Sequence, residues 1–288
     1  MKKKVILFLV GLVSAVFILL GISAYRSATE LTAAVYEVPA DVSEPIRIVQ
    51  LTDLHGHIFG EDNSPLVELV QAQNPDLILM TGDMMDKSDE NADVACALIE
   101  AVSSIAPVYY GFGNHETDWM KRTGTDLIPI LTEAGAVVLE SEYLDVEVND
   151  QSLRIGGFAG YYGYPGMYKI TKKEREAQNA FFEEFENTDR FKLLLSHIPT
   201  TWLDWGGIDR EPVDLVLSGH YHGGQIRLPL IGGIYAPYVG LFPEYTEGIY
   251  YGEQATCILS TGLGSSPGIP RINNLPQVVI VDLQPENS

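Results

Sequence analysis

Short apolar runs alternate with amphipathic segments along most of the chain after residue 45. Between the apolar runs, residues 64–73 and 92–105 carry apolar side chains at helical spacing. Continuous apolar strands separated by helices predict a parallel sheet that is covered on both faces. The three runs that we expect to be strands of this sheet are Ile46–Leu51, Asp76–Met80 and Val108–Tyr110.

The second half of the chain has the same alternation with more β structure. We expect a hairpin, one charged helix with an apolar face at Lys172–Asn187, and several further strands. The predicted fold class is therefore α/β, with two packed β-sheets flanked by helices. The hairpin strands are Tyr143–Val148 and Ser152–Phe158, and the further strands are Phe191–Leu195, Val213–Leu217, two within Gly248–Ser260, and Gln277–Leu283.

The N-terminus precedes this domain with an apolar stretch from Val5 to Ile22. As a helix it would be roughly 27 Å long, close to the thickness of a hydrocarbon core. A cleaved signal peptide has a shorter apolar region, so we expect residues 1–25 to be an uncleaved signal anchor, or transmembrane helix. Residues 26–45 follow as a tether with a first strand around Ala34–Val38. The domain at 46–288 would then lie on the extracytoplasmic side of the cytoplasmic membrane, because the N-terminal lysines stay inside.

Charge limits the partners of the domain. The net charge is −21, yet four cations (Lys2, Lys3, Lys4 and Arg26) precede the first acid, Glu30. The remainder therefore carries −25, which argues against nucleic-acid binding. The two cysteines, Cys96 and Cys257, stand far apart in apolar stretches. We expect two buried free thiols rather than a disulfide.

All six histidines occur in five short segments beside Asp, Asn and Gly, at the ends of expected strands. Imidazole and carboxylate together suit Zn, Mn, Fe or Ni better than Ca. The set has enough ligands for two metal ions. The segments are Thr52-Asp53-Leu54-His55-Gly56-His57, Gly82-Asp83, Gly113-Asn114-His115-Glu116, Ser196-His197 and Gly219-His220-Tyr221-His222.

In this order the segments resemble the calcineurin-like metallophosphoesterase superfamily, whose pattern is D-x-H, G-D, G-N-H-D/E, H and G-H-x-H. The resemblance runs from Ile46 to about Leu283. It implies a four-layer α/β/β/α fold and two divalent or trivalent ions. It also implies a ligand set of seven residues: Asp53, His55, Asp83 and His222 for one ion, and Asp83, Asn114, His197 and His220 for the other, with Asp83 bridging.

The resemblance gives His115 a catalytic role in stabilising the transition state or protonating the leaving oxygen, and Glu116 would orient it. The implied reaction is hydrolysis of a phosphate ester or pyrophosphate by a metal-bridging hydroxide. Membrane-bound relatives resemble UDP-2,3-diacylglucosamine pyrophosphatases, so the substrate is expected to be a phosphorylated small molecule or a lipid-linked compound. The alternative is a non-catalytic, metal-stabilised envelope binding protein that retains the fold. A dinuclear peptidase fits less well, because its ligands are chiefly carboxylates.

Five further features have two interpretations each. His57 is either a surface-loop residue or a contact for substrate phosphate, and Arg271 either forms a structural ion pair or binds that phosphate. Asp86 is expected to cap or to support the ligands rather than bind metal. The tyrosine-rich loop at 160–168 and the apolar loop at 231–243 either pack on the domain or form an apolar rim for a lipid tail or a base.

Overall fold

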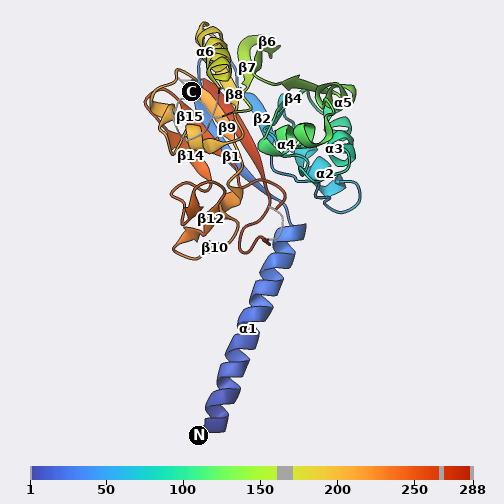
Figure 1. The fold of residues 1–288 in the computed structure, drawn as a ribbon, viewed down its shortest axis with the longest axis vertical. Coiled ribbons are helices and arrows are strands. Elements are labelled where there is room, and N and C mark those ends of the chain that lie inside the picture. Colours follow the sequence, from blue (N-terminus) through green and yellow to red (C-terminus); the bar gives the residue numbers. More distant parts are fainter. Residues whose placement is uncertain (1, 161–170, 266–268, 286–288) are drawn as a thin grey trace.

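Two six-stranded β-sheets pack face to face at the centre of the domain, and helices cover their outer sides (Figure 1). The computed structural model describes residues 2–160, 171–265 and 269–285. The layered arrangement confirms the predicted α/β fold class with two packed sheets.

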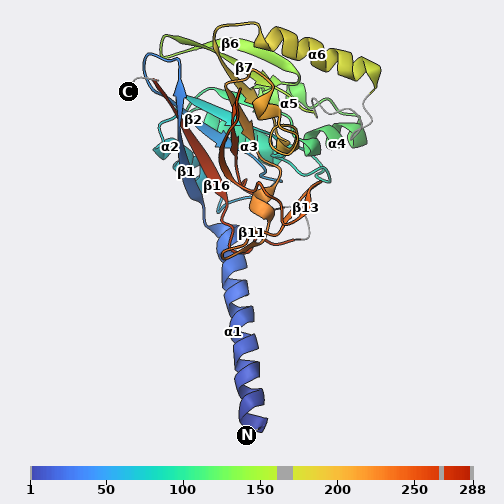
Figure 2. The same ribbon diagram turned by 90° about the vertical axis from the view of Figure 1, so that its left-hand side faces the viewer.

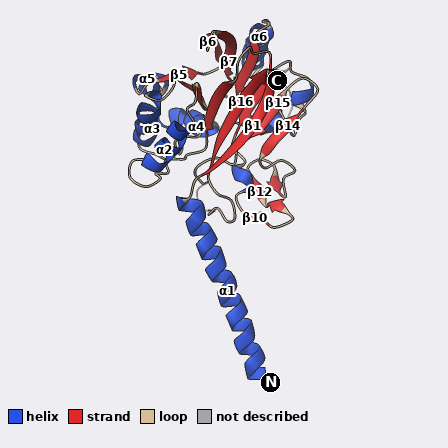
Figure 3. Cartoon of the chain, turned by 180° about the vertical axis from the view of Figure 1, so that it is seen from behind, coloured by secondary structure: helices blue, strands red, loops and turns tan. Residues whose placement is uncertain are grey.

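The first sheet has the strand order β1-β16-β2-β3-β4-β5. Strands β2 to β5 are parallel to one another, as the apolar runs predicted for β2, β3 and β4. At the other edge β16 is antiparallel to β2 and parallel to β1, and Figure 3 shows β1 and β16 side by side. The strands are β1 Thr32–Ala40, β2 Ile46–Leu51, β3 Leu77–Met80, β4 Val108–Gly111, β5 Ala136–Leu139 and β16 Gln277–Pro285.

The second sheet has the order β14-β15-β9-β8-β7-β6. Its centre is parallel, and antiparallel pairs close both edges. Its strands are β6 Glu142–Val148, β7 Gln151–Gly157, β8 Phe191–Leu195, β9 Leu215–Ser218, β14 Gly248–Tyr251 and β15 Thr256–Leu259. Two short hairpins lie between β9 and β14: β10 Arg227–Leu228 with β11 Gly232–Gly233, and β12 Tyr235–Ala236 with β13 Gly240–Leu241.

Helices cover each sheet with an apolar face. In the first layer α2 (Ser64–Ala72), α3 (Asp93–Ser103) and α5 (Ile128–Glu133) pack on the first sheet. In the other layer α6 (Lys172–Glu186) packs three phenylalanines on the second sheet. A third apolar cluster fills the space between the sheets. Burial of each large aliphatic side chain contributes about 1.5–3 kcal/mol, so this layering holds the strand ends in place.

The four short strands β10–β13 were not expected from the sequence, and three larger elements were also missed. The larger elements are α4 (Asn114–Thr123), α5 and β5. Helix α4 buries only Glu116 and Trp119, so it shows no apolar stripe. Both cysteines are free thiols, as predicted, and burial raises the pKa of Cys257 to about 12.

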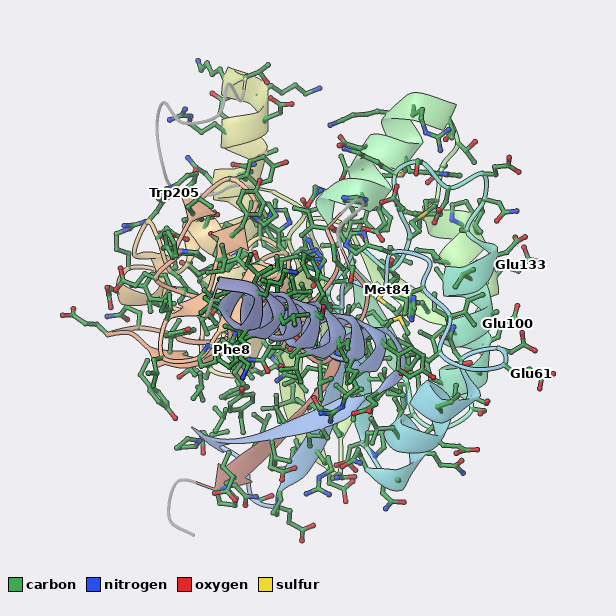
Figure 4. All side chains as sticks on the ribbon, turned by 90° about the horizontal axis from the view of Figure 1, so that it is seen from below. Phe8, Glu61, Met84, Glu100, Glu133 and Trp205 are labelled. Atoms are coloured by element: carbon green, nitrogen blue, oxygen red, sulfur yellow. The ribbon has the colours of Figure 1, made fainter. Side chains whose placement is uncertain are left out.

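Helix α1 (Lys2–Thr29) projects from one end of the domain (Figures 1 and 2). Its residues Lys3–Thr29 are long and apolar enough to cross a membrane, and none of the apolar window is buried in the domain. The last turn of α1 contacts the domain, where the Ala28 carbonyl lies 3.1 Å from His57 Nε2. Seen from below, α1 stands in front of the domain, and Glu61, Glu100 and Glu133 project outward from the helical layer (Figure 4).

Candidate metal centre

The loops that follow β2 and β3 lie against each other and carry the first three predicted ligands. The Asp53 amide donates to the Gly82 carbonyl at 3.0 Å, and the His55 amide donates to the Asp83 carbonyl at 3.0 Å. The two strands are adjacent and parallel, so their carboxyl ends deliver these loops to one edge of the sheet. The cross-loop hydrogen bonds then fix the spacing of Asp53, His55 and Asp83.

Five of the seven predicted ligand residues have left-handed backbone conformations. Their φ angles lie between 48° and 69°, a region that is costly for residues other than glycine. Such strain persists where the surroundings hold it, and it is concentrated at functional sites. The five residues are Asp53, His55, Asp83, His220 and His222.

Two glycines of the motifs permit close approach at this edge. Gly82 has a φ of 88°, and a Cβ there would collide with the backbone of Gly113. A Cβ at Gly219 would collide with the carboxylate of Asp53. The absence of side chains at both positions lets loops from the two sheets meet around the aspartates.

The predicted ligands form two adjoining clusters, and within each cluster the donor atoms lie within 4.8 Å of one another. A third group that meets the same distance joins His55 to Asp86 and His115. The first cluster is Asp53, His55 and His222, and the second is Asp83, His197 and His220. The shortest pair between nitrogen and carboxylate is His197 Nε2 to Asp83 Oδ2, at 3.0 Å.

The two aspartates join these clusters. His55 Nε2 is 3.8 Å from both Asp53 Oδ1 and Asp83 Oδ2, so it faces both carboxylates. His197 Nε2 is also 3.8 Å from Asp53 Oδ1. The clusters therefore form one centre, assembled from both sheets.

Several donor atoms of this centre are buried and have no hydrogen-bond partner. Buried polar atoms are normally paired, so each orphan is expected to have an explanation such as an ion. The orphaned atoms in the centre are His55 Nδ1 and Nε2, Asn114 Oδ1, His197 Nε2, His220 Nε2 and His222 Nδ1. This donor set of imidazole nitrogens, carboxylates and an amide oxygen fits divalent transition metals.

His197 is held in the tautomer that a metal ligand needs. Its Nδ1 lies 2.8 Å from the Thr81 carbonyl, which can only accept, so Nδ1 carries the proton. Nε2 then points at Asp83 and the second cluster. A carbonyl that orients a ligand in this way is common around protein metal sites.

Electrostatics at the centre favour a bound cation. Burial acts to lower the pKa of His197, but Asp83 and Asp53 outweigh it and raise that pKa to about 10. Burial, together with the charge of His197, lowers the pKa of His220 to about 3. Burial acts to raise the pKa of Asp83, yet His197 holds it below its ordinary range. The centre thus keeps ionised carboxylates in the interior, where positive charge stabilises them.

His115 lies at the edge of the centre with one face toward it. The Lys87 amide donates to His115 Nδ1 at 3.1 Å, and Asp86 Oδ2 lies 3.2 Å from the same nitrogen. His115 Nε2 is 3.9 Å from Asp83 Oδ2, so it faces the centre. Burial lowers the pKa of His115, which keeps the ring largely neutral near pH 7. A neutral ring that accepts at Nδ1 carries its proton on Nε2.

Asp86 lies beside His115, a proximity that the sequence reasoning did not specify, and its Oδ2 would pair with Nδ1 only when the ring is protonated. The Ser88 amide and hydroxyl both donate to Asp86 Oδ1, at 2.8 and 2.5 Å, which turns Oδ2 toward His115. Burial acts to raise the pKa of Asp86, but the hydrogen bonds from Ser88 bring it below its ordinary value. Asp86 therefore remains an acceptor beside the ring.

Glu116 is buried and orders the Asp83 loop, whereas we expected it to orient His115. Its carboxylate accepts from the amides of Asp83 and Met84 at 2.8 and 2.9 Å, from the Gly113 amide at 2.9 Å, and from the Tyr110 hydroxyl at 2.7 Å. The His115 side chain is not among these partners. Four hydrogen bonds to one carboxylate explain how the left-handed turn at Asp83 is held.

Arg271 and His57 have structural contacts. Arg271 is buried and donates to the Gly264 and Thr261 carbonyls, so it is neither in an ion pair nor open to a substrate phosphate. His57 stacks edge-on against Phe59, with ring centroids 4.5 Å apart, and its Nε2 meets the end of α1. Both residues brace loops behind the ligands.

Of the two loops with a possible substrate role, the structure describes the 231–243 loop in full. Most of the predicted 160–168 loop lies outside the described residues. In the 231–243 loop, Tyr238 stacks on His220 with ring centroids 5.2 Å apart and an interplanar angle of 13°. Tyr238 and Asn114 both line a cavity of about 580 Å³ that opens beside the centre. The apolar composition had drawn attention to this loop, but only the fold shows that it reaches a histidine of the centre.

The chain is similar to several known proteins. The chain is 26% identical to the uncharacterized metallophosphoesterase YkoQ of Bacillus subtilis over 236 residues, which cover 81% of this chain and 82% of that protein. It is 29% identical to the phosphodiesterase YaeI of Escherichia coli over 252 residues, 84% of each protein. A 5′-nucleotidase precursor from Thermus thermophilus aligns with a TM-score of 0.49 at 18% identity, over 77% of this chain and 49% of that one.

The family profile covers the strands, loops and ligand motifs described above. It matches residues 46–224, which begin with β2 and end just after His222. This chain belongs to the calcineurin-like phosphoesterase family.

Proposed function

We propose that this metallophosphoesterase holds two metal ions in its centre and hydrolyses a phosphodiester or pyrophosphate bond at a membrane surface. Its family and its named relatives make it a metal-dependent phosphoesterase. The observation that carries the two-ion proposal is the pair of adjoining clusters with orphaned donor atoms. No predicted ligand position has lost its ligand-type side chain, which argues against a non-catalytic binding protein.

The clusters suggest how seven side chains divide between two ions. Asp53, His55 and His222 would hold the first ion, and His197, His220 and Asn114 the second. Asp83 would serve both, since its Oδ2 lies between His197 and His55. Nitrogen and oxygen donors of this kind suit Mn, Fe, Zn or Ni.

Two such ions would polarise a phosphoryl oxygen and neutralise the charge that develops in an in-line displacement. The chain's own residues supply orientation and a proton. His115 Nε2–H faces the centre and would donate to a phosphoryl or leaving-group oxygen. The Lys87 amide, which donates to Nδ1, fixes the plane of the ring.

The substrate class follows from the surroundings of the centre. The relative YaeI is named a phosphodiesterase, which favours a diester over a monoester. The cavity beside Asn114 carries Lys121 and Tyr238 on its wall, together with three acids, Asp118, Glu140 and Glu174. With α1 in the membrane and Lys3 and Lys4 inside, the domain would face the extracytoplasmic side. An amphiphilic ester such as UDP-2,3-diacylglucosamine belongs to this class.

The test is hydrolysis of bis-p-nitrophenyl phosphate by the full chain in detergent micelles. We expect activity that a chelator removes and Mn²⁺ restores, and Asp83→Asn should lower kcat/KM by roughly 10³-fold or more, because the substitution weakens both ion sites. Asp62→Asn is a matched control, since Asp62 is exposed and also has a left-handed backbone. Near-normal activity of Asp83→Asn would refute the assignment.

A further inference from the structure

The stretch from Leu228 to Pro243 differs in composition from the rest of the domain. It contains no Asp, Glu, Lys, Arg or His, in a chain whose net charge is −21. It forms the two short hairpins β10–β11 and β12–β13, called here the apolar hairpins. Their exposed large side chains are Leu228, Leu230, Ile231, Tyr235, Tyr238, Val239, Leu241 and Phe242. A contiguous exposed apolar patch of this kind marks an interaction surface.

The backbone of the apolar hairpins is left-handed at three of these side chains, of which Tyr238 also packs on His220 of the domain while Leu230 and Phe242 are exposed. Leu230, Tyr238 and Phe242 have φ angles of 69°, 62° and 56°, where glycine, asparagine or aspartate is normally found. Leu230 is fully exposed, at 107% of its reference area. Leu230 therefore contributes no packing energy within the chain, and only a partner outside the domain could bury its side chain.

The apolar hairpins lie at the end of the domain from which α1 projects (Figures 1 and 2). Hydrogen bonds connect the two. The Asn273 amide donates to Ser23 Oγ of α1 at 2.6 Å, and the Asn273 side chain donates to the Arg227 carbonyl at the base of the first hairpin, at 3.3 Å. A membrane crossed by α1 would therefore meet the hairpins at its surface.

Charge favours a lipid partner at this end. Arg227, the nearest charged residue before the stretch, is paired with Glu247 at 2.5 Å. The nearest charged residue after the stretch is the exposed Glu244, so the patch itself is uncharged and has one carboxylate beside its end. The strongly acidic remainder of the domain is repelled by anionic headgroups, which leaves the neutral hairpins as the part that can enter the interface. Tyrosine side chains, present here at 235 and 238, are typical of that interface.

The second hairpin also reaches the metal centre. Tyr238 stacks on His220 and lines the cavity that contains Asn114. We infer that the apolar hairpins insert into the bilayer surface and present a phosphoester carried by a membrane lipid to the centre. This inference rests on the proposed function for its substrate, whereas the insertion itself does not depend on catalysis.

The first experiment measures insertion in the full chain reconstituted into phosphatidylcholine vesicles. Leu230→Trp places a fluorophore at the hairpin tip, and brominated phosphatidylcholine quenches tryptophans that reach the acyl boundary, about 5–10 Å deep. Leu144→Trp is the matched control, because Leu144 is an exposed leucine of β6 at the end of the domain opposite α1 (Figure 1).

We expect the added fluorescence of Leu230→Trp to be quenched at least twofold more than that of Leu144→Trp. Equal, weak quenching would overturn the inference. The inference would also be overturned if the Leu230→Trp fluorophore became shielded from solvent only when a membrane protein extract is added. That result would favour a protein partner.

The second experiment separates insertion from chemistry. We expect the double variant Leu230→Ser and Ile231→Ser to keep bis-p-nitrophenyl phosphate hydrolysis within about twofold. Its hydrolysis of a diacylglycerol p-nitrophenyl phosphodiester in vesicles should fall about tenfold, since interfacial binding falls with apolar area. Equal rates on the vesicle substrate for this variant and wild type would contradict the inference. If wild type hydrolyses neither substrate while the fluorophore of Leu230→Trp is quenched, the proposed function fails and the insertion stands.

Discussion

The metal centre and the apolar hairpins both hold non-glycine residues in left-handed conformations, and they differ in what surrounds those residues. In the centre the residues are polar and buried, and Asp53, Asp83 and His222 lie among paired loops. In the hairpins they are apolar and exposed, at Leu230, Tyr238 and Phe242.

Each region violates a different rule of folding. Burying polar atoms without partners costs free energy, and so does exposing large apolar side chains at turns. In both regions the backbone strain adds to this cost. Residues that depart from these rules are expected at binding sites. The metal centre therefore indicates bound metal and phosphate, and the apolar hairpins indicate a bilayer.

Outside the proposed ligand set, the largest effect is expected from His115, which faces the centre. His115→Ala should retain both metal ions and slow diester hydrolysis by roughly 10²-fold or more, because a positioned proton donor is lost. Turnover and metal content of the same preparation check this. His57→Ala is the control, since His57 meets α1 instead of the centre. Loss of metal from His115→Ala would show that His115 is a metal ligand, which contradicts its proposed role as a proton donor.

A glycine at one strained position in each region should have opposite results. Leu230→Gly relieves a left-handed backbone at a fully exposed position, so it should stabilise the fold by about 1 kcal/mol and raise Tm by roughly 2–4 °C. Asp53→Gly relieves similar strain but removes a carboxylate of the centre, so metal content should fall. Thermal melts with metal analysis check both. A lower Tm for Leu230→Gly would show that this leucine is stabilising within the chain.

The smallest effect concerns an acid outside both regions. Burial, with the charge of Glu211, raises the pKa of Glu186 at the end of α6 to about 7. A carboxyl with a raised folded pKa favours folding below the unfolded value near 4.5 and loses that contribution as pH rises through 7.

Glu186→Gln should therefore match wild type at pH 4 and be more stable at pH 8, by less than about 1 kcal/mol because solvent screens this half-exposed group. Denaturant unfolding at both pH values measures it. Glu183→Gln, on the exposed face of the same helix, controls for loss of charge. An equal gain in stability at both pH values would contradict the explanation, because Glu186 is uncharged at pH 4.

The sequence predicted the elements whose pattern is local. Strand β2 at Ile46–Leu51 and strand β8 at Phe191–Leu195 have the predicted bounds, because each is a continuous apolar run. Helix α4 was missed because its first residues are the Asn114-His115-Glu116 motif and its remaining surface is polar. The pairing of β1 with β16 joins segments at opposite ends of the chain, which no local pattern reports.

In the candidate site too, features with a local sequence pattern were predicted and contacts between distant segments were not. The motif residues were found from their types and order, and the fold brings all seven predicted ligands to one edge. The supporting contacts were not found, because they join residues distant in sequence: Glu116 to the Asp83 amide, Asp86 to His115, and Tyr238 to His220. Their geometry depends on loop paths, not on composition.

The central claim is that the two buried clusters hold two ions through a shared Asp83. The most direct test is metal analysis by mass spectrometry of the full chain, loaded with Mn²⁺ and then desalted in detergent micelles. We expect two Mn per wild-type chain and at most one for Asp83→Asn, while Asp62→Asn keeps two. A wild-type chain that binds one ion or none, or an Asp83→Asn chain that retains two, would contradict the account.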